Sequence, residues 1–271
     1  MIIDFHTHAF PQRIAERAID KLSFTSGGLA PQTNGSAESL KEEMKKDGVD
    51  ISVVLSIATN PAQQNNVNNF AAELNGDASL YAFGSVHPDA PDALSELERI
   101  KSLGLKGVKF HPEYQKFYVD DEKMKPIYKK ISSLGLITVF HAGYDYGYAP
   151  PYHCMPENMA RALKWFDSPV IAAHWGGVNS GMQVLKHLAG LPIWFDVSFG
   201  YAAIPRGIAL MITEKHTPDK MLFGSDMPWH RPSWEMRLIN TLGLSDSEKD
   251  KIYFKNAAKL LSIGGDCNAA E

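Results

Sequence analysis

The sequence alternates short apolar runs with longer amphipathic segments along its length, and this alternation restricts the fold more than any other feature. Eight such runs, each four to seven residues long and mostly rich in Val, Ile or Phe, are typical of strands buried on both faces of a parallel sheet. The predicted strands are Ile2–Phe5, Ile51–Ile57, Leu80–Val86, Gly107–Phe110, Leu136–Phe140, Val170–Ala173, Ile193–Val197 and Met221–Gly224.

The segments between the apolar runs have the periodicity of amphipathic helices. Ala37–Asp47, Asp89–Leu103 and Asp121–Leu134 each carry apolar residues three or four positions apart, and a glycine follows each of them. Pro156–Phe166 begins with a Pro-Glu pair, which suits the first turn of a helix. Helices that end at a glycine shortly before the next apolar run indicate an alternating α/β fold.

Eight strands that alternate with helices fit two architectures, an open doubly wound sheet and a closed (β/α)8 barrel. The chain of 271 residues is close to the usual size of the barrel, about 250 residues. A doubly wound nucleotide-binding sheet carries Gly-x-Gly-x-x-Gly after its first strand, whereas His6-Thr7-His8 follows the first strand here. No low-complexity tract or linker divides the sequence. We therefore predict an α/β fold, a TIM barrel that forms a single domain over residues 1–271.

The C-terminal part and the composition add further expectations. Ser245–Ile263 is expected to supply one or two closing helices, and residues 264–271 (GGDCNAAE) to be frayed. A net charge of −4 gives no general attraction to nucleic acid or to an anionic membrane, and the apolar runs are too short to span a membrane. Polar residues interrupt the first apolar run, which argues against a signal peptide. Two cysteines, Cys154 and Cys267, cannot build a disulfide framework, so we expect a cytoplasmic protein.

Polar residues gather where the predicted strands end. The carboxyl ends of all barrel strands open onto one face, so side chains as distant in sequence as His6 and Asp226 are expected at the same mouth. The residues concerned are His6, His8, His87, Lys109, His111, His141, His174, Asp196 and Asp226.

Among these residues, His6 and His8 give the most specific indication of a metal site. Residues two apart on a strand point to the same side, so both imidazoles are predicted to face inward and to share one metal ion. Asp4 lies one step deeper on the same side, where it is expected to accept a hydrogen bond from a ligand histidine. Two polar residues on a half-exposed strand end are the alternative interpretation.

His141 and His174 each follow an apolar run directly, and Asp226 follows the last run after Ser225. The alternative to a role at a site is structural. Asp226 could be an ordinary turn or helix-cap aspartate, and His141 and His174 could be core histidines with their hydrogen bonds satisfied. Small residues follow both histidines, which favours a site whose backbone leaves room for a ligand. Imidazole and carboxylate suit zinc, and also iron, nickel or manganese. Three histidines and one aspartate leave room for a water molecule that the metal activates.

With these residues identified, the sequence resembles the amidohydrolase superfamily. It is most similar to the amidohydrolase 2 branch, which includes the 2-amino-3-carboxymuconate semialdehyde decarboxylase and related aromatic-acid decarboxylases. The segments that carry the resemblance fall in the family's order and span residues 2 to 229. They are IIDFHTH, GVKFHP, VFHAG, VIAAHWGG and LFGSDMPW.

The resemblance implies one divalent metal ion held by His6, His8, His141 and Asp226. Zinc is the expected ion, with manganese, iron or nickel as alternatives. The resemblance also implies His174 as the catalytic histidine, and Asp226 as a proton acceptor in addition to its role as a ligand. Some branches of the superfamily carboxylate a lysine on the fourth strand to bridge two metals, so a binuclear site at Lys109 stays open as an alternative.

Several residues are candidates for substrate contact. Lys109 or His111 on the fourth strand is expected to touch the substrate, as the resemblance implies. The segment Tyr144–Met155 is rich in tyrosine and longer than a tight connection, which predicts a lid or an aromatic wall, with a packed loop as the alternative. The remaining candidates are Tyr144, Trp175, Trp229 and His230 for the pocket wall, and Arg206 and Arg231 for a substrate carboxylate or, alternatively, the surface.

These observations leave several functions open. The first hypothesis is hydrolysis of an amide, ester or lactone in a small organic substrate, and the second is non-oxidative decarboxylation of a small unsaturated or aromatic acid. A metal-dependent deoxyribonuclease also shares Asp-x-His-x-His, but the net negative charge argues against it. A catalytically inactive scaffold protein is the last alternative, although every ligand position is filled. Barrels of this kind often pair, so a homodimer is a further hypothesis.

Overall fold

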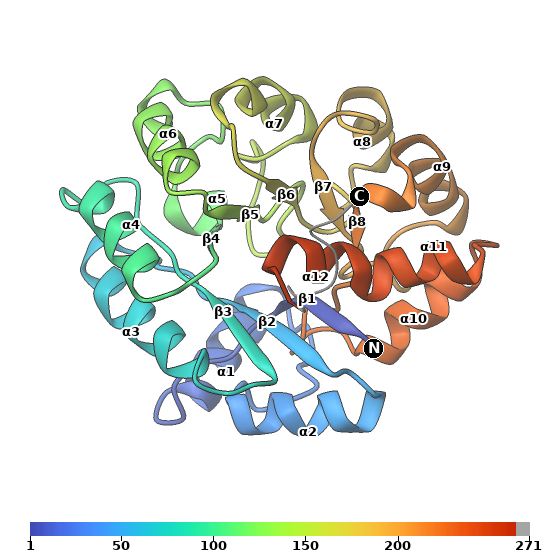
Figure 1. Ribbon diagram of the computed structural model, residues 1–271, viewed down its shortest axis with the longest axis horizontal. Coiled ribbons are helices and arrows are strands. Elements are labelled where there is room, and N and C mark those ends of the chain that lie inside the picture. Colours follow the sequence, from blue (N-terminus) through green and yellow to red (C-terminus); the bar gives the residue numbers. More distant parts are fainter. Residues whose placement is uncertain (264–271) are drawn as a thin grey trace, which may run out of the picture.

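Eight parallel strands form the centre of the molecule, and helices surround them in a ring (Figure 1). The computed structural model describes residues 1–263, so the prediction for residues 264–271 lies outside the described part of the chain. The strands are β1 (Ile3–Thr7), β2 (Ile51–Leu55), β3 (Leu80–Phe83), β4 (Gly107–Phe110), β5 (Ile137–Phe140), β6 (Val170–Ala172), β7 (Trp194–Asp196) and β8 (Met221–Leu222). This arrangement confirms the predicted TIM barrel.

The strands form two hydrogen-bonded ladders, β1-β2-β3 and β4-β5-β6-β7-β8, and two seams join them into a closed barrel. At the first seam, Gly84 N donates to Gly107 O over 2.9 Å and Lys109 N donates to Gly84 O over 2.8 Å. At the second seam, Phe5 N donates to Phe223 O over 2.8 Å and His8 N donates to Met227 O over 2.7 Å. Closure leaves the carboxyl ends of all eight strands on one face.

The helices cover the outside of the barrel (Figure 1). They are α1 (Ala15–Thr25), α2 (Ala37–Asp47), α3 (Gln64–Leu74), α4 (Ala93–Ser102), α5 (Pro112–Gln115), α6 (Lys125–Ser133), α7 (Pro156–Ala162), α8 (Gly181–His187), α9 (Arg206–His216), α10 (Pro232–Asn240), α11 (Asp246–Asp250) and α12 (Asn256–Leu261). A five-residue π-helix, Lys251–Lys255, joins α11 to α12. No helix in the described part of the chain is both long and apolar enough to cross a membrane.

Helix α2 has the predicted bounds because both of its ends carry strong signals. The Ser36 side chain accepts a hydrogen bond from Ser39 N at the start, and Gly48 adopts a left-handed conformation with φ 72° at the end. By contrast, strands β2 and β3 are shorter than their apolar runs. Val86 is fully buried although it follows the end of β3, so loop packing extends the apolar pattern beyond the strand itself.

The apolar core has two layers, one inside the barrel and one between the strands and the helices. Val53 and Leu55 of β2 belong to the inner layer, whereas Val54 between them packs in the outer layer with helical residues. Ala257 and Leu261 of α12 join the inner layer, and α12 lies across the centre of the ring in Figure 1. Helix α12 therefore closes the end of the barrel opposite to the strand carboxyl ends.

Strand β1 contains an irregularity that affects its histidines. Asp4 pairs with Ser52 and Thr7 pairs with Val54, so β1 uses one residue more than β2 over this stretch. A bulge of this kind redirects side chains. As a result, Phe5 belongs to the inner core while the adjacent His6 lines the cavity at the mouth of the barrel.

Candidate metal centre and active site

The strand carboxyl ends surround a cavity of about 100 Å³, here called the catalytic cavity. Its wall combines residues from the strand ends with residues from the loops above them. They are His6, His8, Phe10, Leu22, Ser26, Leu29, Ile57, Lys109, His111, Tyr114, His141, Tyr144, Asp145, Tyr146, His174, Val178, Phe199, Asp226, Pro228 and Trp229. The cavity therefore contains all four residues predicted as metal ligands, together with His174.

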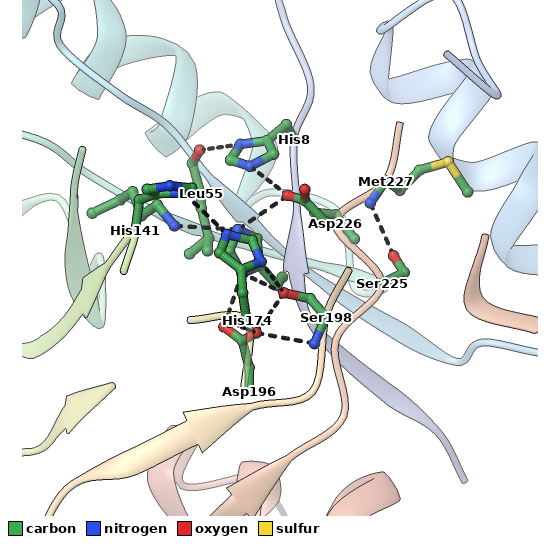
Figure 2. Close-up of polar contacts among 12 residues, drawn as sticks. His8, Leu55, His141, His174, Asp196, Ser198, Ser225, Asp226 and Met227 are labelled. Atoms are coloured by element: carbon green, nitrogen blue, oxygen red, sulfur yellow. Dashed lines mark hydrogen bonds and ion pairs between the residues drawn. The ribbon is translucent and has the colours of Figure 1, made fainter. Parts of the chain in front are cut away.

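Asp196, at the end of β7, is the hub of the hydrogen bonds beneath the cavity (Figure 2). Its Oδ2 accepts a hydrogen bond from His6 Nδ1 over 2.8 Å. Its Oδ1 accepts from His174 N over 3.0 Å, from Ser198 N over 3.1 Å and from the Ser198 hydroxyl. A carboxylate with this many donors holds β1, β6 and β7 in fixed relation at the floor of the cavity.

These contacts assign the protons on His6, His8 and His174. His6 Nδ1 donates to Asp196, and His8 Nδ1 donates to Leu55 O over 2.9 Å. Because the Ser198 hydroxyl donates to Asp196, it accepts from His174 Nδ1, which lies 2.8 Å away. Each ring therefore carries its proton on Nδ1 and keeps a lone pair on Nε2.

His141 is the fourth histidine of the cavity whose proton can be assigned. Its Nε2 donates to Tyr144 O over 3.0 Å, which leaves a lone pair on Nδ1. This Nδ1 lies 3.1 Å from His174 Nε2, so two lone pairs face each other. Burial lowers the pKa of both rings, which disfavours a proton between them. A metal cation relieves this arrangement without protonating either ring.

The carboxylate of Asp226 faces the same centre (Figure 2). Its Oδ1 lies 3.3 Å from His6 Nε2 and 3.2 Å from His8 Nε2. One ligand atom each from His6, His174 and Asp226 lies within 4.8 Å of the others. Four imidazole lone pairs and one carboxylate, fixed by hydrogen bonds behind them, are a donor set that fits a divalent cation such as zinc.

Electrostatics keep these groups in the form that binds metal. Burial lowers the pKa of His6 far below its usual value, so the ring is neutral. For Asp226, burial favours the protonated form, but the facing nitrogens of His8 and His6 and the positive charge of Lys109 outweigh it, so the pKa is lowered and the carboxylate is charged. Neutral imidazoles and an ionised carboxylate are the ligating forms.

Lys109 places a buried ammonium group beside His6 at the floor of the catalytic cavity. The residue is 1% exposed, and its Nζ lies 3.2 Å from His6 Nε2. Burial lowers its pKa to about 8, although Asp196 and Asp226 oppose this shift. Lys109 therefore remains mostly protonated at neutral pH and supplies positive charge to the floor of the cavity.

A second group of possible ligands, His111, His141 and Asp145, lies beside the first. The His111 and His141 rings stack with centroids 4.2 Å apart and planes 11° apart. Imidazole lone pairs lie in the ring plane, so two stacked rings cannot direct them at one ion. His111 and Asp145 therefore lie in the wall of the cavity, beside the His141 ring.

Comparisons with known proteins identify the family. The family model described as Amidohydrolase, of the amidohydrolase 2 type, matches residues 3–263. The chain belongs to this family. The match confirms the resemblance seen in the sequence, and it places the chain among metal-dependent enzymes. The comparison with curated proteins found no match.

The solved structures similar to this chain include proteins named as decarboxylases and proteins named as hydrolases. An uncharacterized TIM-barrel protein from Bordetella bronchiseptica is 18% identical with a TM-score of 0.76, covering 96% of this chain and 98% of that one. The 5-carboxyvanillate decarboxylase from Sphingomonas paucimobilis is 16% identical with a TM-score of 0.69, covering 96% and 98%. A putative 2-pyrone-4,6-dicarboxylic acid hydrolase from Pseudomonas putida is 16% identical with a TM-score of 0.67, covering 96% and 97%. At these identities the likeness supports the fold.

The structure places the predicted substrate contacts in three different surroundings. Lys109, His111, Tyr144 and Trp229 line the catalytic cavity. Trp175 lines a neighbouring cavity instead.

His230 lines neither cavity among the described residues, because its Nδ1 bonds to Glu235 Oε1 over 2.7 Å and its ring stacks on Phe199.

Asp4 differs from its predicted place, whereas Arg206 and Arg231 agree with the interpretation that treats them as surface arginines. Arg206 donates to Thr241 O, and Arg231 pairs with Glu43 over 2.7 Å, so both guanidinium groups are held outside the catalytic cavity. Asp4 accepts from the backbone of His6 and from Ser225, not from an imidazole. Asp196 takes the supporting position predicted for Asp4, because the bulge in β1 turns the His6 ring toward β7.

The predicted lid contributes Asp145, which sequence reasoning missed. Asp145 Oδ2 lies 3.3 Å from His111 Nε2, and Gly147 N donates to Asp145 Oδ1 over 2.7 Å. His111 also stacks on Tyr114 at 3.6 Å, so it is held between Tyr114 and His141. The tyrosines of the lid segment drew attention in the sequence, whereas the single carboxylate among them carried no spacing signal.

The buried His111 ring makes the stability of the fold depend on pH. Burial, with His141 alongside, lowers the pKa of His111 from 6.5 to about 3. Below pH 6.5 the His111 imidazole binds a proton in the unfolded chain but not in the folded protein. The free energy of unfolding therefore falls as the pH drops from 6.5 toward 3. His111→Gln is expected to weaken this fall by up to about 1.4 kcal/mol per pH unit. Thermal unfolding of both proteins between about pH 7 and pH 5 tests this, and equal slopes would contradict it.

Proposed function

We propose that this chain is a metal-dependent hydrolase that cleaves an amide, ester or lactone bond in a small organic substrate. The observation that carries the proposal is the position of Asp226, whose Oδ1 lies within 3.3 Å of the unprotonated nitrogens of both His6 and His8. A carboxylate in this position both completes a metal site and stands where a water molecule on that site would release its proton.

The metal-binding roles follow from the donor set. His6, His8, His141 and Asp226 would hold the ion, as their lone pairs and charge favour. When bound, a divalent cation supplies Lewis-acid polarisation of a carbonyl group and lowers the pKa of water toward neutrality. Asp196 would keep the His6 ring in its ligating orientation.

The chain's own residues would then move the protons of hydrolysis. Water adds to the carbonyl carbon, and its proton passes to His174 Nε2 or Asp226. Ser198 connects the charged His174 ring to the Asp196 carboxylate, which stabilises the imidazolium. The Lys109 ammonium group stabilises the negative charge that develops on the carbonyl oxygen. The bond to the leaving nitrogen or oxygen breaks as the residue that took the proton, His174 or Asp226, returns it to the leaving atom.

Non-oxidative decarboxylation is the second candidate, and Lys109 is the observation that favours it. A buried cation beside the metal site can pair with a substrate carboxylate. In this reaction His174 or Asp226 first takes up a proton from solvent. The bond between carbon and the carboxylate then breaks with release of CO₂, its electron pair stays on the carbon, and the protonated residue delivers the proton there. Two solved structures with this fold are named as decarboxylases of aromatic acids.

One experiment distinguishes the two reactions. The protein loaded with Zn²⁺ or Mn²⁺ is incubated separately with 2-pyrone-4,6-dicarboxylate, 5-carboxyvanillate and 2,6-dihydroxybenzoate, and with a panel of small esters and lactones. Hydrolysis is expected, measured as acid release without CO₂. Release of CO₂ without acid would support the second candidate, and no reaction with any metal would contradict both.

A further inference from the structure

We propose that a second cavity, next to the catalytic cavity, binds a neutral apolar part of the same substrate. This side cavity lies between the loop that joins β6 to α8 and the loop that joins β7 to α9. The proposal rests on the proposed function, because it assumes that the reacting group occupies the catalytic cavity. It adds that the substrate has two parts, a polar reacting group and an alkyl or aryl extension.

The two cavities share a wall. His174, Val178 and Phe199 line both of them, so the two cavities meet at these three side chains, next to the proposed reacting groups. The side cavity has a volume of about 390 Å³, against about 100 Å³ for the catalytic cavity. Ligand pockets usually measure about 300 to 1,000 Å³. The larger space for a ligand is therefore beside the reacting groups, not above them.

The chemistry of the side cavity differs sharply from that of the catalytic cavity. None of its lining residues within the described chain is Asp, Glu, Lys or Arg. Most of the wall is apolar, and its polar side chains are the uncharged groups of Asn179, Ser180 and Gln183 together with His174 at the shared edge. The apolar side chains are Trp175, Val178, Met182, Phe199, Ile204 and Ile208. A charged extension would lose its hydration here without gaining a partner, whereas an alkyl or aryl group would gain apolar contact.

The backbone around the side cavity is held in an unusual conformation. Four of its non-glycine residues have positive φ, namely 59° at His174, 61° at Trp175, 50° at Asn179 and 54° at Phe199. Such residues are strained and persist only where the surrounding structure fixes them, which is common at binding sites.

Specific contacts fix this wall. Trp175 N donates to Asp196 O over 2.7 Å, and Asn179 Nδ2 donates to the Tyr146 hydroxyl over 3.2 Å. The Phe199 ring stacks on His230 with centroids 4.1 Å apart, and Glu235 holds His230 from behind. Phe199 is therefore held at the junction of the two cavities, and His230 is the residue that positions it.

Straight-chain carboxylates provide a direct test. The carboxylate of acetate, butyrate, hexanoate or octanoate binds at the metal, while the alkyl chain extends toward the side cavity. The Co²⁺-substituted protein is titrated with each acid, and its visible absorption gives the dissociation constant. Each methylene group that enters the side cavity is expected to tighten binding about fourfold.

Two matched variants locate the effect. Ala203→Phe places a ring in the side cavity and is expected to weaken octanoate binding at least about tenfold while leaving acetate binding unchanged. Ala78→Phe introduces the same ring at an exposed position just before β3, at the opposite end of the barrel, and should leave the whole series unchanged.

The outcomes separate the two proposals. If acetate binds but affinity does not rise with chain length, or if Ala203→Phe does not reduce the rise, the side cavity is not a substrate site. If no acid perturbs the Co²⁺ spectrum, the proposed metal-dependent function fails, and the side-cavity proposal fails with it. A rise with chain length that Ala203→Phe removes and Ala78→Phe preserves supports the proposal.

Discussion

Replacing His6 by alanine is expected to remove the bound metal ion and, with it, all metal-dependent turnover. The substitution deletes one ligand and also leaves Asp196 Oδ2 without its imidazole donor and Lys109 without the His6 nitrogen 3.2 Å away. Loss of a residue that merely supports a ligand typically costs about 10- to 100-fold in metal affinity, and loss of the ligand itself should cost more. Metal stoichiometry after dialysis, measured by mass spectrometry, checks this result.

Two further variants make the expectation specific. Asp196→Asn keeps all four proposed ligands but weakens the support behind His6, so metal affinity is expected to fall by the intermediate factor of about 10 to 100. His87→Ala removes a buried histidine that follows β3 but does not line the catalytic cavity, and it should retain full metal content. A His6→Ala protein that still binds one equivalent of metal would contradict the ligand assignment.

The barrel and the cluster of polar side chains at the carboxyl ends of its strands could both be predicted from the sequence, because both follow from simple periodicities. Eight apolar runs with helices between them leave few architectures, and a closed parallel sheet brings every strand carboxyl end to one face. Hence His6 and Asp226, at the ends of β1 and β8, could be predicted as neighbours, and the structure places them 3.3 Å apart.

The supporting residues could not be predicted in the same way. Asp4 lies within β1 and Asp196 ends β7, so both carboxylates are near the His6 ring, and the structure shows that Asp196 is the one that contacts it. Ser198 lies two residues after Asp196, a spacing that places two side chains on one side of a strand, but a lone serine carries no chemical signal of its own.

Loop residues were the hardest to place. Trp175 and Trp229 both follow conspicuous strand-end residues, yet only Trp229 lines the catalytic cavity. The left-handed backbone at His174 and Trp175 turns the chain so that Trp175 faces the side cavity instead. Positive φ at non-glycine residues arises from tertiary constraint, which local sequence patterns do not report.

His174→Asn is expected to lower kcat by about 100- to 10,000-fold while leaving metal content unchanged. Asparagine is the appropriate replacement because residue 174 has φ 59°, a conformation that asparagine tolerates better than alanine. The substitution removes the nitrogen that Ser198 and Asp196 prepare for proton transfer, but it leaves the lone pairs of His6 and His8 and the carboxylate of Asp226 in place.

Ser198→Ala tests whether His174 acts through the hydrogen-bond chain to Asp196. It removes the hydroxyl that accepts from His174 Nδ1, so the imidazolium loses its link to the carboxylate. We expect kcat to fall less than in His174→Asn, and the double variant to be no worse than His174→Asn alone, because both changes remove one proton path. Additive losses would show that Ser198 acts elsewhere. Wild-type turnover in metal-loaded His174→Asn would leave Asp226 as the sole proton acceptor.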